Sequence, residues 1–196
     1  MSSQETLVER VHTTSVFIFS RDDMRQTTIS LRGHGPVYTV NSDQSSTRTS
    51  IFHFGDHVPL AVSEQRGILP DKITFRGQDR QKLKSWLKFS SVSLFPVTFE
   101  AFGRFYTWRF SARGELSMHS QEHPEEAIAW FTPSRRSDTT GSPTMLAASL
   151  TLKPDALEIQ DLTVVSFLLL EQKSRTMSRP TGGVAGPYAF FVEALY

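Results

Sequence analysis

The sequence predicts a mostly β protein whose sheet curls around one short hydrophobic helix near the C-terminus, and three observations support this fold class. Short segments of alternating apolar and polar residues, separated by Gly, Pro, Asn and Asp, fill the first three-quarters of the chain. The apolar run Leu162–Leu170 then breaks that alternation. The chain has 196 residues and no cysteine, so a hydrophobic core rather than disulfides must stabilise the fold.

Nine segments carry the strand signal, which is a period of two between turn residues. The clearest is Phe105–Ser111, in which Tyr106 and Trp108 point to one face and Thr107 and Arg109 to the other. Short strands at regular spacing are typical of an antiparallel barrel or sandwich. In chain order the predicted strands are Thr14–Ser20, Arg25–Leu31, Val37–Val40, Arg48–Phe54, Lys72–Arg76, Val97–Phe102, Phe105–Ser111, Ala127–Phe131 and Leu146–Leu152.

The segment Asp155–Arg175 changes to a helical pattern. Asp161 can cap the amides of the first turn and Lys173 lies near the end, which is the charge order that the helix dipole favours. Leu162–Leu170 is apolar on almost every side of a helical wheel, so a helix there must be buried on all its faces. We therefore expect a central helix at about residues 161–175. A buried strand is the alternative, because Val and Phe also favour strands.

The charges are nearly balanced, with 21 basic and 20 acidic residues and a net charge of +1. Nucleic-acid-binding domains usually show a strong basic excess, so we expect no nucleic acid partner. The N-terminus lacks the basic and apolar regions of a signal peptide, and Leu162–Leu170 is too short to span a bilayer. Together with the absence of cysteine, these features predict a cytoplasmic protein. No motif calls for a cofactor.

We expect one domain over residues 14–176, preceded by a flexible segment at 1–13. A Gly/Pro-rich extension, 177–196, follows the domain and ends in the apolar segment Tyr188–Tyr196. That segment could bind a protein partner or a second copy of the chain. A protein-interaction scaffold is therefore one of the functional alternatives.

The order of these features resembles an uncharacterised fungal family with a tubby-like fold, similar in layout to LURP-one-related and scramblase domains. The resemblance covers about residues 14–176. It rests on the strand Tyr106-Thr-Trp108, the short strand that begins at Ile128, and Asp161 ahead of the apolar helix. It implies a closed antiparallel β-barrel around that helix and brings no catalytic motif. Some tubby-like domains bind phosphoinositide headgroups, so the resemblance also implies, by fold analogy alone, a role at lipids.

Basic residues concentrate in Lys72–Lys88, with Trp86 among them. Each cation near an anionic membrane surface contributes about 1 kcal/mol, and an exposed indole suits the headgroup layer. We therefore expect a non-enzymatic binding module for anionic lipid headgroups such as phosphoinositides. A solvated loop with a buried indole is the simpler interpretation of the same pattern. The candidate ligand-binding residues are Lys72, Arg76, Arg80, Lys82, Lys84, Trp86 and Lys88.

The main alternative is an enzyme or carrier for a small apolar molecule, as in fungal secondary metabolism, with a pocket at one end of the barrel. Tyr106 and Trp108 could line such a pocket, and Arg109 or Glu100 could supply its polar group. No G-x-S-x-G elbow, P-loop or G-x-G-x-x-G motif accompanies them. The sequence therefore favours a protein without catalytic activity.

Two pairs of histidines could contribute metal ligands. His119-Ser-Gln-Glu-His123 has the H-x-x-E-H spacing of some zinc enzymes, but Pro124 follows at once and opposes the helix that this chemistry needs. His53-Phe-Gly-Asp-His57 is interrupted by glycine. We expect no metal site, and these four histidines are the weak candidates for one.

Overall fold

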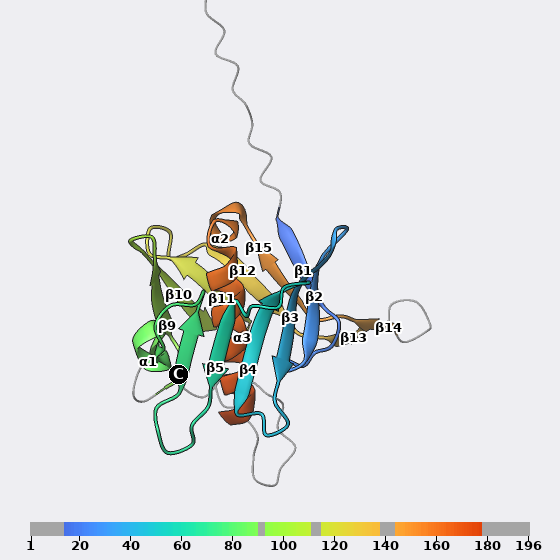
Figure 1. Ribbon diagram of the computed structural model, residues 1–196. Coiled ribbons are helices and arrows are strands. Elements are labelled where there is room, and N and C mark those ends of the chain that lie inside the picture. The colour runs from blue at the N-terminus through green and yellow to red at the C-terminus, as the bar shows by residue number, and fades with distance from the viewer. Residues whose placement is uncertain (1–13, 90–92, 111–114, 138–143, 178–196) are drawn as a thin grey trace, which may run out of the picture.

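The computed structural model describes residues 14–89, 93–110, 115–137 and 144–177, and within them the protein is mostly β, as predicted (Figure 1). The main element is one antiparallel sheet of 13 strands in the order β7-β6-β5-β4-β3-β2-β1-β15-β12-β11-β10-β9-β8. β13 and β14 form a separate two-stranded sheet. The strands are β1 Ser15–Phe19, β2 Thr27–Leu31, β3 Gly35–Ser42, β4 Arg48–His53, β5 Ala61–Glu64, β6 Lys72–Phe75, β7 Gln81–Lys82, β8 Lys88–Phe89, β9 Val97–Ala101, β10 Arg104–Phe110, β11 Leu116–Ser120, β12 Ala127–Thr132, β13 Arg135–Ser137, β14 Thr144–Leu146 and β15 Ser149–Leu152.

The large sheet is open, with β7 and β8 at its two edges. Among the described residues, β7 pairs with β6 alone and β8 with β9 alone. The short helix α1 (Leu83–Trp86) joins the two edges, and the Leu87 amide donates to the Leu83 carbonyl at 2.7 Å. These backbone groups are used in a helical turn and cannot join a ladder between the edges. The predicted closed antiparallel barrel around a central helix is therefore wrong.

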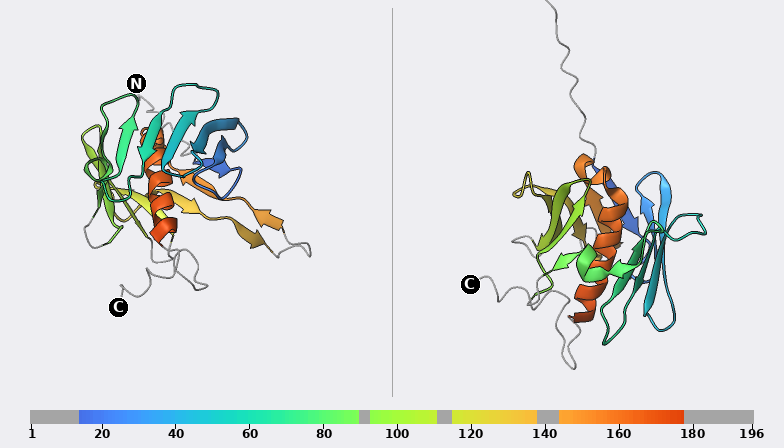
Figure 2. Two further views of the ribbon diagram at one scale, coloured as in Figure 1. Left: turned by 60° about the horizontal axis from the view of Figure 1, so that its bottom comes forward. Right: turned by 60° about the vertical axis from the view of Figure 1, so that its left-hand side comes forward.

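The longest helix, α3 (Gln160–Met177), lies on the concave side of the open sheet, with strands from both halves of the sheet beside it (Figure 2). Every residue from Thr163 to Gln172 is buried. The Trp108 indole donates to the Ser166 hydroxyl at 2.9 Å, and the ring of Phe167 contacts aromatic rings from β1, β10 and β12. A helix enclosed in this way needs no polar face, which explains why only Thr163 and Ser166 interrupt the apolar run. The segment is a helix and not the alternative buried strand.

α2 (Pro154–Leu157) is a single turn that precedes α3. Among the helices of the described residues, none combines the length and the apolarity that crossing a bilayer requires.

Each of the nine predicted segments overlaps an observed strand, but two central strands, β5 and β11, were not predicted. β11 has the alternation of a strand, since Leu116 and Met118 alternate with Ser117 and His119. All four of these side chains are buried, the polar ones included. The strand signal is therefore present in the sequence, but it is only five residues long and runs into the polar segment that ends at Pro124.

Candidate functional site

The predicted basic segment lies along the two free edges of the sheet and the α1 turn between them. Lys82 on β7, Lys84 in α1 and Lys88 on β8 are exposed, and half-buried Lys72 is the cross-strand partner of Lys82. None of the four forms an ion pair with a carboxylate of the described residues. We call these four residues the lysine edge.

The two arginines of the predicted set are bound to acidic residues. Nη2 of Arg76 donates to Oδ2 of Asp161 at 2.8 Å, and Arg80 pairs with Glu64. Their charges are therefore largely compensated, which leaves the four lysines as the unpaired part of the patch. The sequence gives no sign of the Arg76 contact, because its partner is 85 positions away.

The indole of Trp86, in the α1 turn that carries Lys84, packs against the core. It is half-buried against the core, and its ring lies 5.8 Å from the ring of Phe75 between centroids. The lipid-binding prediction expects an exposed indole in the headgroup layer, and a half-buried ring offers less surface for that contact.

The four weak catalytic candidates do not converge on one pocket. Tyr106 and Trp108 are buried on the face of β10 that looks toward α3, whereas Arg109 lies on the opposite face. Glu100 is exposed and pairs in register with Phe105, also on that opposite face. The sheet itself separates the two aromatic residues from the two charged ones.

A groove of about 600 Å³ runs over β9, β10 and β11 on the outer face of the sheet, away from α3. It lies on the convex side and not at an end, where the enzyme or carrier hypothesis expects a pocket. We call it the Arg109 groove. It is lined by Thr98, Phe105, Thr107, Arg109, His119, Ser120, Gln121 and Pro124.

A closed ring of hydrogen bonds fixes His119 beside Arg109. A guanidinium can only donate, so the 3.4 Å contact from Nη2 of Arg109 makes Nδ1 of His119 the acceptor. The ring proton is then on Nε2, which donates to the Ser117 hydroxyl at 3.0 Å. That hydroxyl donates in turn to the Arg109 carbonyl at 3.3 Å. Burial and the neighbouring Arg109 charge lower the pKa of His119, in agreement with a neutral imidazole.

The four histidines proposed as weak metal candidates lie apart. His119 is in the Arg109 groove, whereas Nε2 of His53 lies 3.2 Å from Asp161. His57 and His123 are exposed in turns. In the part of the chain that the structure describes, no three potential metal ligands of the His, Cys, Asp and Glu types come together.

Asp161, at the start of α3, accepts hydrogen bonds from β3, from β4 and from the residue that follows β6. Its carboxylate accepts from the Tyr38 hydroxyl at 2.7 Å, from Arg76 at 2.8 Å and from Nε2 of His53 at 3.2 Å. Burial acts to raise the pKa of Asp161, but the hydrogen bonds from Arg76 and Tyr38 outweigh it and lower the pKa overall. The cluster fastens the helix to β3, β4 and the end of β6.

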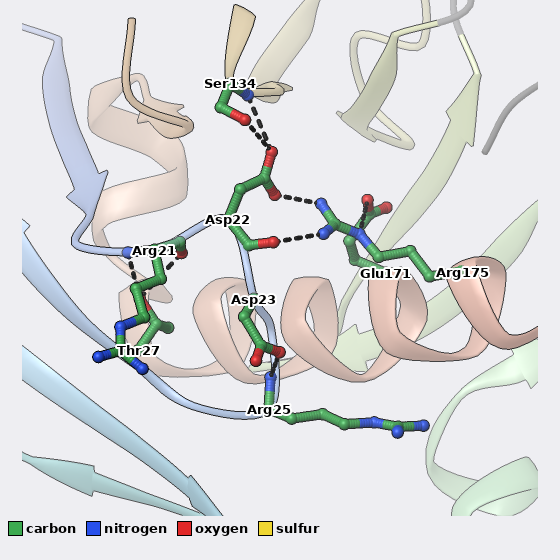
Figure 3. A network of polar contacts seen from close by, with 8 residues as sticks. All are labelled: Arg21, Asp22, Asp23, Arg25, Thr27, Ser134, Glu171 and Arg175. Carbon is green, nitrogen blue, oxygen red and sulfur yellow. Dashed lines mark hydrogen bonds and ion pairs between the residues drawn. The ribbon is translucent and has the colours of Figure 1, made fainter. Parts of the chain in front are cut away.

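At the other end of α3, Arg175 lies between two carboxylates (Figure 3). Its Nε donates to Glu171 at 2.8 Å, and its Nη2 donates to Oδ1 of Asp22 at 2.5 Å. Oδ2 of Asp22 accepts from the amide and the hydroxyl of Ser134, at 3.0 and 2.6 Å. A polar hollow of about 690 Å³ adjoins this network. Asp22 and Arg175, two of the charged residues that line it, bind each other, so the network is primarily a structural anchor.

No curated protein matches the chain, and no solved structure matches it. The model of one protein family matches residues 22–176. That match tests neither the tubby-like resemblance nor lipid binding, and both stay predictions. Because the matched residues make up most of the chain, the protein belongs to the family described as "Family of unknown function (DUF6593)".

Proposed function

We propose that this protein is a binding module that recognises anionic lipid headgroups, such as those of phosphoinositides, through the lysine edge. The observation that carries the proposal is the concentration of four lysines on adjoining elements, without a carboxylate partner among the described residues. Their ammonium groups offer several donors each to phosphate oxygens.

The placement of Lys72 and Lys82 supports a role in binding. The two residues face each other directly across β6 and β7, and like charges in that position destabilise a sheet. A polyanion bound between the two ammonium groups would attract both of them and offset their mutual repulsion. Lysines on edge strands also prevent two sheets from pairing edge to edge, so the experiment must separate that role from lipid binding.

The expected strength of the interaction is moderate. At about 1 kcal/mol for each cation, four lysines contribute about 4 kcal/mol, roughly a thousandfold in affinity at low salt. Binding of this kind weakens as salt rises, because the charges are exposed and screened.

Co-sedimentation with vesicles tests the proposal. We expect the full chain to sediment with phosphatidylcholine vesicles that contain a phosphoinositide, and to remain in the supernatant with phosphatidylcholine alone. The triple variant K82Q/K84Q/K88Q should lose most of this binding. A matched triple variant of exposed arginines elsewhere, R32Q/R48Q/R135Q, removes the same charge and should retain it.

Three results would contradict the proposal. One is equal sedimentation with neutral and phosphoinositide vesicles at low salt. Another is equal loss of binding in the two triple variants, which would assign the effect to net charge. If the lysine variant binds vesicles normally but forms oligomers in light scattering, the lysines protect the sheet edges and the proposal fails.

A further inference from the structure

We propose that the Arg109 groove is a second binding site, which takes a small organic monoanion with an apolar body, a carboxylate in the first instance. The anionic head would lie at Arg109 and the apolar body against Phe105 and Pro124. The site meets the lysine edge only at Lys88, whose ammonium lies over the Phe105 ring, and this inference does not depend on lipid binding.

The dimensions and lining of the groove suit a small ligand. Its volume of about 600 Å³ falls within the range of known small-molecule sites, roughly 300–1,000 Å³. Phe105 and Pro124 supply apolar side chains, and more of the lining surface is apolar than polar. The polar groups beside Arg109 and His119 come from Thr98, Thr107, Ser120 and Gln121. A mainly apolar wall with a small number of fixed polar groups is the usual composition of such sites.

Arg109 has no counterion among the residues that the structure describes. Arg109 is half-buried on the sheet surface, and no carboxylate of the described residues forms an ion pair with it. Its contacts with described residues, to the Pro124 carbonyl and to His119, both use Nη2. Donors on Nη1 and Nε are left for a carboxylate, whose two oxygens match the guanidinium fork. Partial burial of an unpaired cation is costly, and a bound anion would remove that cost.

The surroundings of Arg109 hold it in place for binding. The Pro124 carbonyl and Nδ1 of His119 fix the orientation of Nη2, and the ring of hydrogen bonds through Ser117 fixes His119 in turn. Since His119 is neutral and accepts a hydrogen bond there, it orients the cation without repelling it. A site that is ordered before the ligand arrives loses less entropy on binding.

Charges at the far end of the groove favour a single negative charge on the ligand. Phe105 and Arg109 are four positions apart on β10, which corresponds to about 13 Å along the strand. Nζ of Lys88 lies 5.3 Å from the centre of the Phe105 ring, and Glu100 is the cross-strand partner of Phe105. Both signs of charge are present at the Phe105 end, whereas Arg109 has no carboxylate in an ion pair with it among the described residues, so the anionic head is expected at Arg109.

Titration of the labelled full chain with 4-phenylbutyrate, followed by NMR, tests the site. This compound joins a carboxylate to an aromatic ring by a short chain, and its uncharged amide, 4-phenylbutanamide, is the matched control ligand. We expect saturable shifts of groove residues with the acid, and an affinity at least about tenfold weaker for the amide, which corresponds to about 1.4 kcal/mol. R109Q should reduce the affinity for the acid to that of the amide, whereas R48Q, at an exposed arginine on another strand, should leave it unchanged.

Further variants keep the test decisive. If R109Q does not fold, F105A removes the apolar wall at a partly exposed position and should weaken binding of the acid several-fold. Variant K82Q/K84Q/K88Q includes the groove-rim Lys88, so K82Q/K84Q is the form that should bind the acid normally. Equal affinity for acid and amide, or no saturation by the acid below about 10 mM, would overturn the proposal. Equal binding of inorganic phosphate and 4-phenylbutyrate would also overturn it, because the apolar wall would then have no role.

Discussion

The two ends of α3 are both tied to the sheet by charged side chains, but they differ in how far water reaches them. At the end of the helix, the side chains of Arg175 and Asp22 are 28% and 22% exposed. At the start, the carboxylate side chain of Asp161 is 12% exposed, yet its partners His53 and Arg76 are 45% and 56% exposed. Both partners of the first pair are mostly buried, whereas the cationic partners of Asp161 are largely exposed.

This difference determines how much each anchor should contribute to stability. Removing one partner from a buried charge pair costs several kcal/mol, because the other charge stays in a poor environment. Exposed cations contribute little, since water and salt screen them. We infer that the end of α3 is the stronger anchor, and that the start responds more readily to pH and salt.

The largest effect should come from a charge placed between the two anchors. Val165 is fully buried in the middle of α3, and V165D would place a carboxylate there without a cation. We expect this variant to fail to fold, and both anchors to be lost together. Circular dichroism and solubility measure the outcome, with V165A as the control that removes volume only. A soluble V165D protein with the parent's thermal midpoint would show that the helix is not enclosed.

The next largest effect should be at the end of the helix. R175M removes the cation that binds both Glu171, which is fully buried, and Asp22. We expect the free energy of unfolding in urea to fall by about 3 kcal/mol. Adding E171Q to R175M should recover part of that loss, because the buried carboxylate is then neutral. A loss below about 1 kcal/mol would mean that the end of the helix is no stronger than the start.

At the start of the helix, D161N should reduce the free energy of unfolding by about 1–2 kcal/mol at neutral pH. The folded-state pKa of Asp161 is lowered below 3.8, so its carboxylate stabilises the protein above that value. The contribution is lost as the pH falls through the folded-state pKa. Urea unfolding across acidic pH should therefore bring wild type and D161N together. A gap that persists at the lowest pH would mean that shape, and not charge, is what Asp161 contributes.

The smallest effect should come from Y38F. Burial raises the pKa of Tyr38, so its hydroxyl stays protonated and donates to Asp161 at 2.7 Å. The same oxygen accepts from the Gln160 amide at 2.6 Å. We expect a loss of about 0.5–1.5 kcal/mol in unfolding free energy. In the double variant Y38F/D161N the two losses should not add, and full additivity would show that the hydrogen bond contributes nothing.

The strands and the helix were predictable because their patterns are local. Alternation identified nine strand segments, and an apolar run without a polar face identified a buried helix. β11 escaped prediction although Leu116 and Met118 alternate correctly with Ser117 and His119, because the strand is only five residues long and runs into the polar segment that ends at Pro124.

The sequence by itself determined a mostly β chain with one enclosed helix and a segment rich in lysine, since those properties depend on neighbours within a few positions. Tertiary structure alone decided that the sheet stays open, because closure depends on twist and register summed over 13 strands. It also decided the partners. Arg76 meets Asp161 across 85 positions, and His119 meets Arg109 because β10 and β11 pair in one particular register. Arg76, which the sequence suggests as a lipid contact, is therefore a helix anchor. His119, which the sequence suggests as a weak metal ligand, supports the Arg109 groove.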